Sequence, residues 1–177
     1  KMEIVIINGT PGSGKDQFVK EVQSLIGDYR CYNYSTVDFV KFVALCAGWK
    51  EDKTPRNRKF LSDLKKLLAY WNDVPYQKTR REIEDAYRYA DAHGCLNESV
   101  MFIHCREPEE IERFVNDYYA HTLLVQRAVA DEIEQSNSSD ANVSDYAYEV
   151  IVENDGTLED LNNAARTYIT EVLGLTI

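Results

Sequence analysis

The sequence has few cysteines, and their spacing matches neither a metal site nor a disulfide framework. All four stand singly in the chain, and none belongs to the C-x-x-C spacing of zinc sites. Dispersed thiols of this kind are typical of small buried or half-buried side chains in a reducing compartment. We therefore expect a cytoplasmic protein in which the cysteines only pack, at Cys31, Cys46, Cys95 and Cys105.

Long apolar runs are absent as well. No stretch of the sequence approaches the length of a membrane span, and the N-terminal residues do not have the pattern of a signal peptide. There is no internal repeat and no low-complexity tract. With 177 residues, 44% hydrophobic and 28% charged, the composition predicts one globular domain over residues 1–177 and no membrane partner.

Positive charge is scarce and unevenly distributed. The chain has 20 Lys and Arg against 30 Asp and Glu, a net charge of −10, which disfavours general binding of nucleic acid. Residues 50–81 hold ten basic and four acidic side chains, a local +6, so the rest of the chain sums to −16. This basic segment is either a solvated helical face or a cationic wall for a phosphorylated substrate.

A glycine-rich motif follows the first apolar run. Residues 9–15 read G-T-P-G-S-G-K, the G-x-x-x-x-G-K pattern of phosphate-binding loops, directly behind Ile4–Ile7. Glycines permit the backbone angles and close approaches that such a loop needs. Its amides can surround a phosphate at the N-terminus of a helix that begins near Lys15 and ends at Gly27. We expect the nucleotide to bind Gly9, Pro11, Gly12, Ser13, Gly14, Lys15, Asp16 and Gln17.

The residue after the P-loop lysine departs from the common pattern. Ser or Thr usually stands there and ligates magnesium through its hydroxyl, whereas this chain has Asp16. A carboxylate beside a polyphosphate is repelled unless a cation lies between them. Asp16 therefore either holds the metal, directly or through water, or weakens metal binding; a third reading is an acidic residue favoured by the helix dipole.

Five β-rich apolar runs alternate with helical patterns, which predicts βαβ units and a parallel sheet. The predicted strands are Glu3–Asn8, Cys31–Ser35, Val100–His104, Thr122–Gln126 and Tyr148–Val152.

More than sixty residues separate the second and third predicted strands. One helix is predicted from Val37 to Cys46, and another from about Tyr76 to His93. Between them, Leu61, Leu64, Leu68 and Trp71 repeat at helical spacing. Helices are also expected after Pro108 and after Thr157, where Thr157 and Asp160 form a predicted capping pair.

In an open parallel sheet, a ligand lies beyond the carboxyl ends of the strands. The predicted strands place there the P-loop, Ser35–Asp38, His104–Arg106, Arg127 and the turn at Asn154. Phosphoryl transfer depends on positioning and on neutralising charge, so cations that converge on one edge suit this chemistry.

Three passages resemble the nucleoside-monophosphate-kinase branch of P-loop proteins, above all the phage-type deoxynucleoside monophosphate kinases and the animal phosphomevalonate kinases. Ser13–Asp16 shares the Asp after the P-loop lysine, and His104–Glu110 is similar to the family's D-x-R-x-x-x-E. Tyr148–Leu161 contains the ending N-D-G-T-L-E-D-L. The resemblance implies an α/β three-layer sandwich whose five-stranded parallel sheet has the order 2-3-1-4-5. A helical substrate-binding insert, residues 36–95, would lie between strands 2 and 3.

The same resemblance implies ATP as donor and Mg²⁺ as cofactor. Arg106 would contact the acceptor phosphate or the transferred group, and Glu110 would orient it. Arg127 would be a lid arginine in a lid segment at residues 127–145. The alternatives are an Arg106 salt bridge to a glutamate of the following helix and a merely solvated Arg127.

His104 is the main departure from the family, which has Asp at that position. It leaves Asp16 and Asp38 as acidic candidates for the metal, and a packed histidine at a strand end is the simpler interpretation. On the insert, Arg58 and Arg81 are preferred for the acceptor phosphate because guanidinium binds it bidentately. The predicted substrate-binding set is Asp38, Lys41, Arg58, Arg81 and Arg106.

Together these features predict an ATP- and Mg²⁺-dependent kinase with Lys15, Arg106 and Arg127 as catalytic residues. The expected acceptor is a small phosphorylated molecule, first of all a nucleoside or deoxynucleoside monophosphate. A kinase of a non-nucleotide phosphate such as phosphomevalonate is one alternative. A nucleotide-binding sensor or ATPase with little kinase activity is another. A GTPase is disfavoured because no N-K-x-D is present. The sequence leaves open the base preference of the donor and the oligomeric state.

Overall fold

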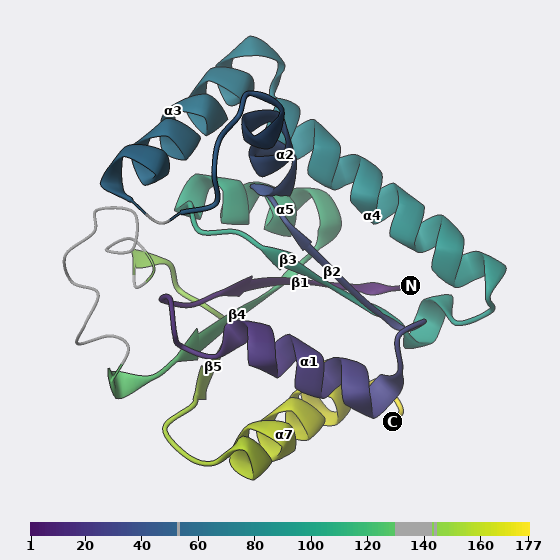
Figure 1. Cartoon of the computed structure of the whole chain (residues 1–177). Coiled ribbons are helices and arrows are strands. Elements are labelled where there is room, and N and C mark those ends of the chain that lie inside the picture. Colours follow the sequence, from purple (N-terminus) through teal and green to yellow (C-terminus); the bar gives the residue numbers. More distant parts are fainter. Residues whose placement is uncertain (53, 130–142, 144) are drawn as a thin grey trace. The chain divides into compact units, whose positions relative to one another are not determined.

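The computed structural model describes residues 1–52, 54–129, 143 and 145–177 (Figure 1). These residues form two compact units. Unit 1 comprises Lys1–Asn33 with Ala86–Ile177, and unit 2 comprises Tyr34–Asp85. No helix in the described part of the chain is long and apolar enough to cross a membrane.

One five-stranded sheet organises unit 1, with the order β2-β3-β1-β4-β5. Strand β1 pairs in parallel with both β3 and β4, and β4 pairs in parallel with β5. The predicted α/β fold, the parallel sheet and its order are therefore confirmed. The strands are β1 Glu3–Asn8, β2 Cys31–Ser35, β3 Val100–His104, β4 His121–Gln126 and β5 Val150–Glu153.

Two strand boundaries differ from the prediction. Strand β4 begins one residue earlier, at His121, and the predicted strand Tyr148–Val152 is wrong at both ends because β5 is Val150–Glu153. Tertiary hydrogen bonds explain the late start of β5. The hydroxyl of Tyr148 accepts a hydrogen bond from Asn8, and the amide of Glu149 donates to the Thr122 side chain instead of to the strand ladder.

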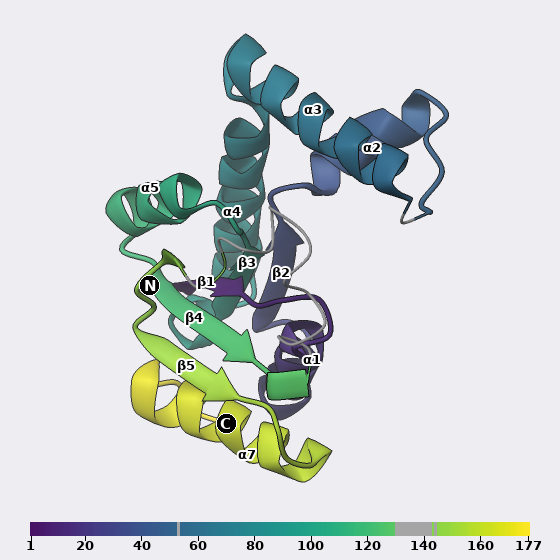
Figure 2. The same ribbon diagram turned by 90° about the vertical axis from the view of Figure 1, so that its left-hand side faces the viewer.

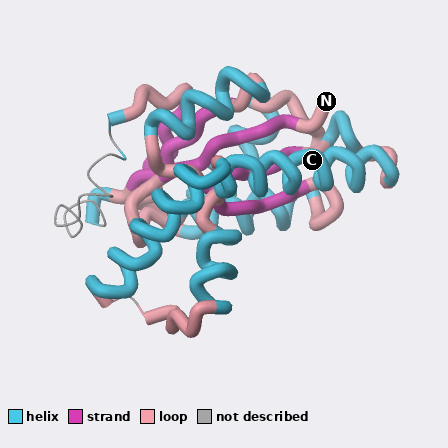
Figure 3. Tube along the Cα trace, turned by 90° about the horizontal axis from the view of Figure 1, so that it is seen from above, coloured by secondary structure: helices cyan, strands magenta, loops and turns pink. Residues whose placement is uncertain are grey.

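Helices cover both faces of the sheet in unit 1, which gives three layers (Figure 2). Helices α1 (Lys15–Ile26) and α7 (Leu158–Thr167) lie side by side on one face. Helix α5 (Pro108–Tyr118) contacts β1 and β4 on the other. Seen from above, the strands run side by side (Figure 3). A 3₁₀ turn at Leu96–Glu98 precedes β3, and a π-helical turn, Tyr168–Val172, follows α7.

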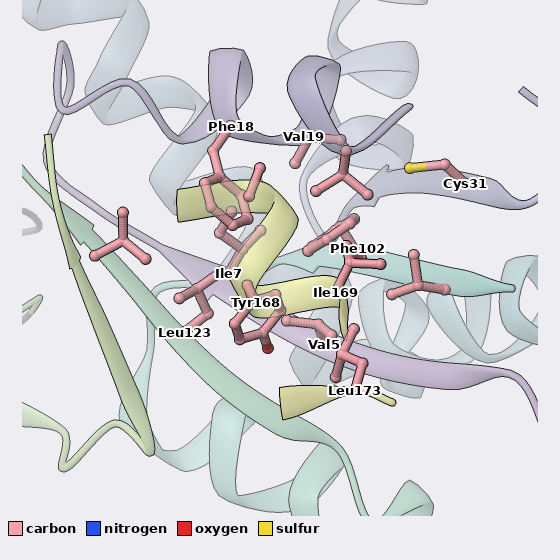
Figure 4. Packing of buried hydrophobic residues seen from close by; sticks show 14 of the residues in the cluster. Val5, Ile7, Phe18, Val19, Cys31, Phe102, Leu123, Tyr168, Ile169 and Leu173 are labelled. Atoms are coloured by element: carbon pink, nitrogen blue, oxygen red, sulfur yellow. The ribbon is translucent and has the colours of Figure 1, made fainter. Parts of the chain in front are cut away.

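The main core lies between the sheet and the α1–α7 layer (Figure 4). Strand residues alternate between faces, so Val5 and Ile7 of β1 join this core. Phe18 of α1 is completely buried and meets Phe102 and Tyr168 edge-on, with ring centroids 6.3 and 5.8 Å away. This packing fixes the start of α1, and with it the loop that connects β1 to α1.

Helix α7 begins with the predicted capping box, which is confirmed. The Thr157 hydroxyl oxygen accepts from the Asp160 amide, and the Asp160 carboxylate accepts from the Thr157 amide. Both ends of the box satisfy amides that a helix N-terminus leaves unpaired.

Unit 2 is helical and contains α2 (Asp38–Cys46), α3 (Pro55–Asn72) and the first part of α4 (Val74–Ala92), which continues into unit 1. Thr54 caps α3, with Pro55 in its first turn. Helix α3 packs on α2, yet it buries no residue fully. The leucines of the predicted stripe are half-buried, whereas Trp71 is 79% exposed.

Candidate functional site

The loop between β1 and α1 has the backbone of an anion-binding turn. The Ser13 amide donates to the Thr10 carbonyl over 3.0 Å, and Gly14 adopts a left-handed conformation with φ 95°. The first bond within α1 runs from the Phe18 amide to the Gly14 carbonyl, at 2.9 Å. The amides that precede Phe18 therefore point out of the helix N-terminus, where they and the helix dipole favour a phosphate.

Two glycines of this loop lie where a side chain would not fit. A Cβ on Gly9 would collide with the Val125 carbonyl and the Ser13 hydroxyl, and a Cβ on Gly14 would collide with the Asn154 side chain. The glycines predicted from the motif thus allow close approach of β4 and of the turn after β5. The Ser13 side chain is buried beside Gly9, and its Oγ has no hydrogen-bond partner among the described residues.

Asn8, the last residue of β1, fixes the entry to the loop. Its Oδ1 accepts from the Gly9 amide at 2.8 Å, and its Nδ2 donates to the Tyr148 hydroxyl at 2.7 Å. Burial raises the pKa of Tyr148 to about 12, so the phenol stays neutral at physiological pH. Sequence reasoning missed both residues, because neither belongs to the G-x-x-x-x-G-K pattern.

Asn154 holds the loop from the side of β5, and Asp155 contacts the segment that follows β4. The Asn154 side-chain Nδ2 donates to the Ser13 carbonyl over 2.9 Å, and its own amide donates to the Gln126 carbonyl over 2.8 Å. The Asp155 carboxylate accepts from the Ala128 amide at 2.8 Å. The sequence placed the Asn154 turn at this edge but gave no sign of these partners.

His104, at the end of β3, lies between β2 and the P-loop helix. Its Nε2 is 2.8 Å from Asn33 Oδ1, and its Nδ1 is 3.7 Å from Asp16 Oδ1. The His104 side chain is 13% exposed, whereas that of Asp16 is 77% exposed. The structure therefore brings together the two residues that depart from common P-loop chemistry.

The residues at this edge fit a magnesium ion that is held mainly by phosphate and water. In the described residues no three His, Cys, Asp or Glu side chains are grouped to hold a metal. Mg²⁺ commonly binds through one or two carboxylates together with substrate phosphates and water. Asp16 supplies one solvent-exposed carboxylate beside the P-loop, which satisfies that requirement.

The arginines predicted for catalysis follow β3 and β4. Arg106 is half-buried two residues after β3. Its neighbour Cys105 is buried, with its Sγ 3.4 Å from the Glu110 carboxylate in the first turn of α5. Arg127 is exposed, directly after β4. Most of the predicted lid, residues 127–145, lies outside the described residues.

The remaining predicted substrate residues belong to unit 2. Asp38 accepts a hydrogen bond from the Ser35 amide at 2.9 Å and is 4.0 Å from the Lys41 ammonium. Arg58 and Arg81 are exposed on α3 and α4. Within this unit Asp38 therefore begins helix α2, and the three basic side chains point at least partly to solvent.

No protein-family model matches the chain, and no curated protein sequence does. Among solved structures, an unliganded sugar kinase from Janibacter sp. HTCC2649 is 14% identical with a TM-score of 0.49, and each chain is covered to 100%. The protein TT1252 from Thermus thermophilus is 18% identical with a TM-score of 0.43, covering 97% of this chain and 98% of that one. Likeness at this level identifies no function. The P-loop kinase-like fold follows from the sheet order and from the loop between β1 and α1.

Proposed function

We propose that the protein is a kinase that transfers the γ-phosphoryl group of ATP to a small phosphorylated acceptor, first of all a nucleoside or deoxynucleoside monophosphate. The observation that carries the proposal is the P-loop itself. Its left-handed Gly14 opens α1, and side chains from β1 and from the turn after β5 hold it in place. Such a loop binds the phosphates of a nucleotide.

The donor is held by the loop amides and by Lys15. Lysine at this position reaches the outer phosphates and offsets charge that develops during transfer. Mg²⁺, when bound, neutralises charge on the phosphate oxygens, and Asp16 is the residue that would hold it. His104 and Asn33 support Asp16 from the neighbouring strands, because the imidazole lies between the two side chains.

Transfer requires cations near the equatorial oxygens of the moving phosphoryl group. We assign this task to Arg106 and Arg127, which follow β3 and β4, the two strands that flank β1 in the sheet. The acceptor phosphate would bind basic residues of the insert, Lys41, Arg58 and Arg81, with Asp38 beside Lys41. This assignment agrees with the net +6 of residues 50–81.

One observation favours a second candidate, a nucleotide-binding sensor with little turnover. His104 stands where the family resembled by the sequence has a carboxylate, so this position offers an imidazole, 3.7 Å from Asp16, in place of an acidic metal ligand. A protein of this kind would bind ATP without transferring phosphate. A kinase for a non-nucleotide phosphate shares the first mechanism and differs only in the acceptor.

One assay distinguishes the kinase from the nucleotide-binding sensor. ADP production from Mg·ATP is measured with the ribo- and deoxynucleoside monophosphates and phosphomevalonate, for the wild type, Lys15→Ala and Lys20→Ala. Lys20 is an exposed lysine of the same helix and serves as the matched control. We expect turnover with one acceptor, lost about 100-fold or more in Lys15→Ala and kept in Lys20→Ala. ATP binding without turnover on any acceptor would support the sensor.

A further inference from the structure

The turn after β5 contacts two other segments of the carboxyl edge through side chains. Asn154 donates from its Nδ2 to the Ser13 carbonyl of the P-loop, at 2.9 Å. The next residue, Asp155, accepts from the Ala128 amide at 2.8 Å, one residue beyond Arg127. The turn therefore touches both the loop proposed to hold the donor and the segment that begins with a proposed catalytic arginine.

The turn is itself firmly fixed. The Asn154 amide donates to the Gln126 carbonyl over 2.8 Å. Its other end is the capping box of α7, in which the Asp160 carboxylate accepts from both the amide and the hydroxyl of Thr157. Gly156 has no room for a side chain, because a Cβ would collide with that same carboxylate. A carboxamide mounted on this turn can thus impose a position on its partner.

The hydrogen bond from Asn154 determines which way one P-loop peptide faces. In a planar trans peptide, the carbonyl oxygen and the amide hydrogen point in opposite directions. Holding the Ser13 carbonyl toward Asn154 therefore turns the Gly14 amide to the opposite side. If this peptide flipped, a carbonyl oxygen would replace an N–H donor, and it would repel phosphate.

We propose that Asn154 is a positioning residue that keeps the Ser13–Gly14 peptide in its phosphate-binding orientation. The inference rests on the proposed nucleotide binding but not on phosphoryl transfer. Gly14 is part of the same device: its left-handed backbone and missing side chain let the carboxamide approach. From the same turn, Asp155 accepts a hydrogen bond from the amide of Ala128, the residue after Arg127. The turn after β5 thus contacts both the P-loop and the segment that contains Arg127.

The test compares two asparagines that each donate one side-chain hydrogen bond. Asn154 contacts the P-loop, whereas Asn162 of α7 donates to Glu21 of α1 over 2.7 Å, away from the loop. The affinity of inorganic tripolyphosphate and of ADP is measured by calorimetry, beside the melting temperature, for the wild type, Asn154→Ala, Asn154→Asp and Asn162→Ala. The ¹⁵N shift of the Gly14 amide is followed while tripolyphosphate is added.

We expect the two Asn154 variants to bind tripolyphosphate about tenfold more weakly, as the loss of one hydrogen bond implies. Asn162→Ala should bind tripolyphosphate like the wild type. Its melting temperature should change by about as much as that of Asn154→Ala. The Gly14 amide should shift on binding in the wild type and much less in the Asn154 variants. Asn154→Asp keeps the side-chain volume but adds a negative charge that repels phosphate by itself. If the alanine variant unfolds, the shift of the Gly14 amide in Asn154→Asp at saturating tripolyphosphate therefore tests the inference, rather than the affinity.

Wild-type affinity in the Asn154 variants would overturn the inference, and so would an equal loss in Asn162→Ala. A wild type that binds tripolyphosphate but phosphorylates no acceptor would overturn the proposed function alone. A wild type that binds neither ADP nor tripolyphosphate would overturn both.

Discussion

His104 is the residue whose surroundings say most about the chemistry. It lies within hydrogen-bonding distance of Asn33 and faces Asp16, so one imidazole links β2, β3 and the start of α1. A neutral imidazole cannot replace a carboxylate as an oxygen ligand for magnesium. In the proposed function, the exposed Asp16 is then the acidic group that would hold the cation beside the P-loop.

We expect His104→Asp to raise the affinity of the site for Mg²⁺. The substitution would set a second carboxylate close to Asp16, and two carboxylates bind Mg²⁺ better than one. The magnesium concentration at half-maximal activity should fall several-fold. ADP binding by calorimetry at graded Mg²⁺ checks the same shift without an acceptor. His104→Asn, which adds no charge, is the control, and an equal change in both variants would contradict this explanation.

At the scale of elements, the sequence predicted regular structure better than it predicted contacts. Strands β1, β2 and β3 have their predicted bounds, and in β1 and β3 these bounds coincide with the ends of a compact apolar run. Helix α4 begins at Val74, two residues earlier than predicted, since proline is tolerated in a first helical turn. The start of β5 could not be predicted, because the Thr122 side chain of β4 accepts the hydrogen bond of the Glu149 amide.

The candidate site shows the same limit. The P-loop was evident from local spacing, whereas the side chains that brace it were not. Asn154 and Ser13 are 141 positions apart in the sequence, and Asn8 and Tyr148 are 140 apart. No periodic pattern connects such pairs. The assignments of Arg58, Arg81, Arg106 and Arg127 remain predictions.

The capping box of α7 makes the stability of this element depend on pH. Hydrogen bonds from Thr157 lower the pKa of Asp160 below its usual 3.8; the bond from the backbone amide has the larger effect and the bond from the hydroxyl the smaller one. A carboxyl group whose pKa is lower in the folded than in the unfolded protein stabilises the fold at pH values above its unfolded-state pKa. This stabilisation is lost as the pH falls through the folded-state pKa. Wild type and Asp160→Ala should thus differ in melting temperature at pH 7, and the difference should shrink as the pH falls below the usual pKa of an aspartate.

Melting curves between pH 2.5 and pH 7 check this expectation. Glu159→Ala removes a neighbouring exposed acid of the same helical turn that takes no part in the box, so it should lower the melting temperature less than Asp160→Ala and isolates the effect of the helix dipole. A constant difference between wild type and Asp160→Ala, independent of pH, would show that the carboxylate charge does not matter.

At the scale of the whole molecule, charge and structure divide along similar lines. The basic segment, residues 50–81, falls entirely within unit 2, which comprises residues 34–85. The remaining chain carries a net −16, yet it contains the P-loop. In the proposed reaction, long-range attraction of an anionic acceptor would therefore come from unit 2.

This asymmetry predicts that acceptor binding weakens with salt. Raising the ionic strength from about 50 to about 500 mM shortens the Debye length well below 10 Å, so the KM of the acceptor should rise several-fold. Initial rates at saturating Mg·ATP measure the effect. The double variant Arg58→Gln, Arg81→Gln should have a higher KM and a flatter dependence on salt. If the KM of the acceptor did not depend on salt, residues 50–81 would not act as a cationic wall for the acceptor and would be a solvated helical face instead.

Both tryptophans of the chain, Trp49 and Trp71, belong to unit 2. Trp71 is 79% exposed, whereas the indole nitrogen of Trp49 is buried and has no hydrogen-bond partner among the described residues. Selective excitation of indole fluorescence therefore reports on residues 34–85 alone. Trp71 should emit like an indole in water, and Trp49 like an indole that is partly shielded from water. The unit proposed to receive the acceptor thus carries its own optical label, and its response can be recorded separately from events at the P-loop without attaching a dye.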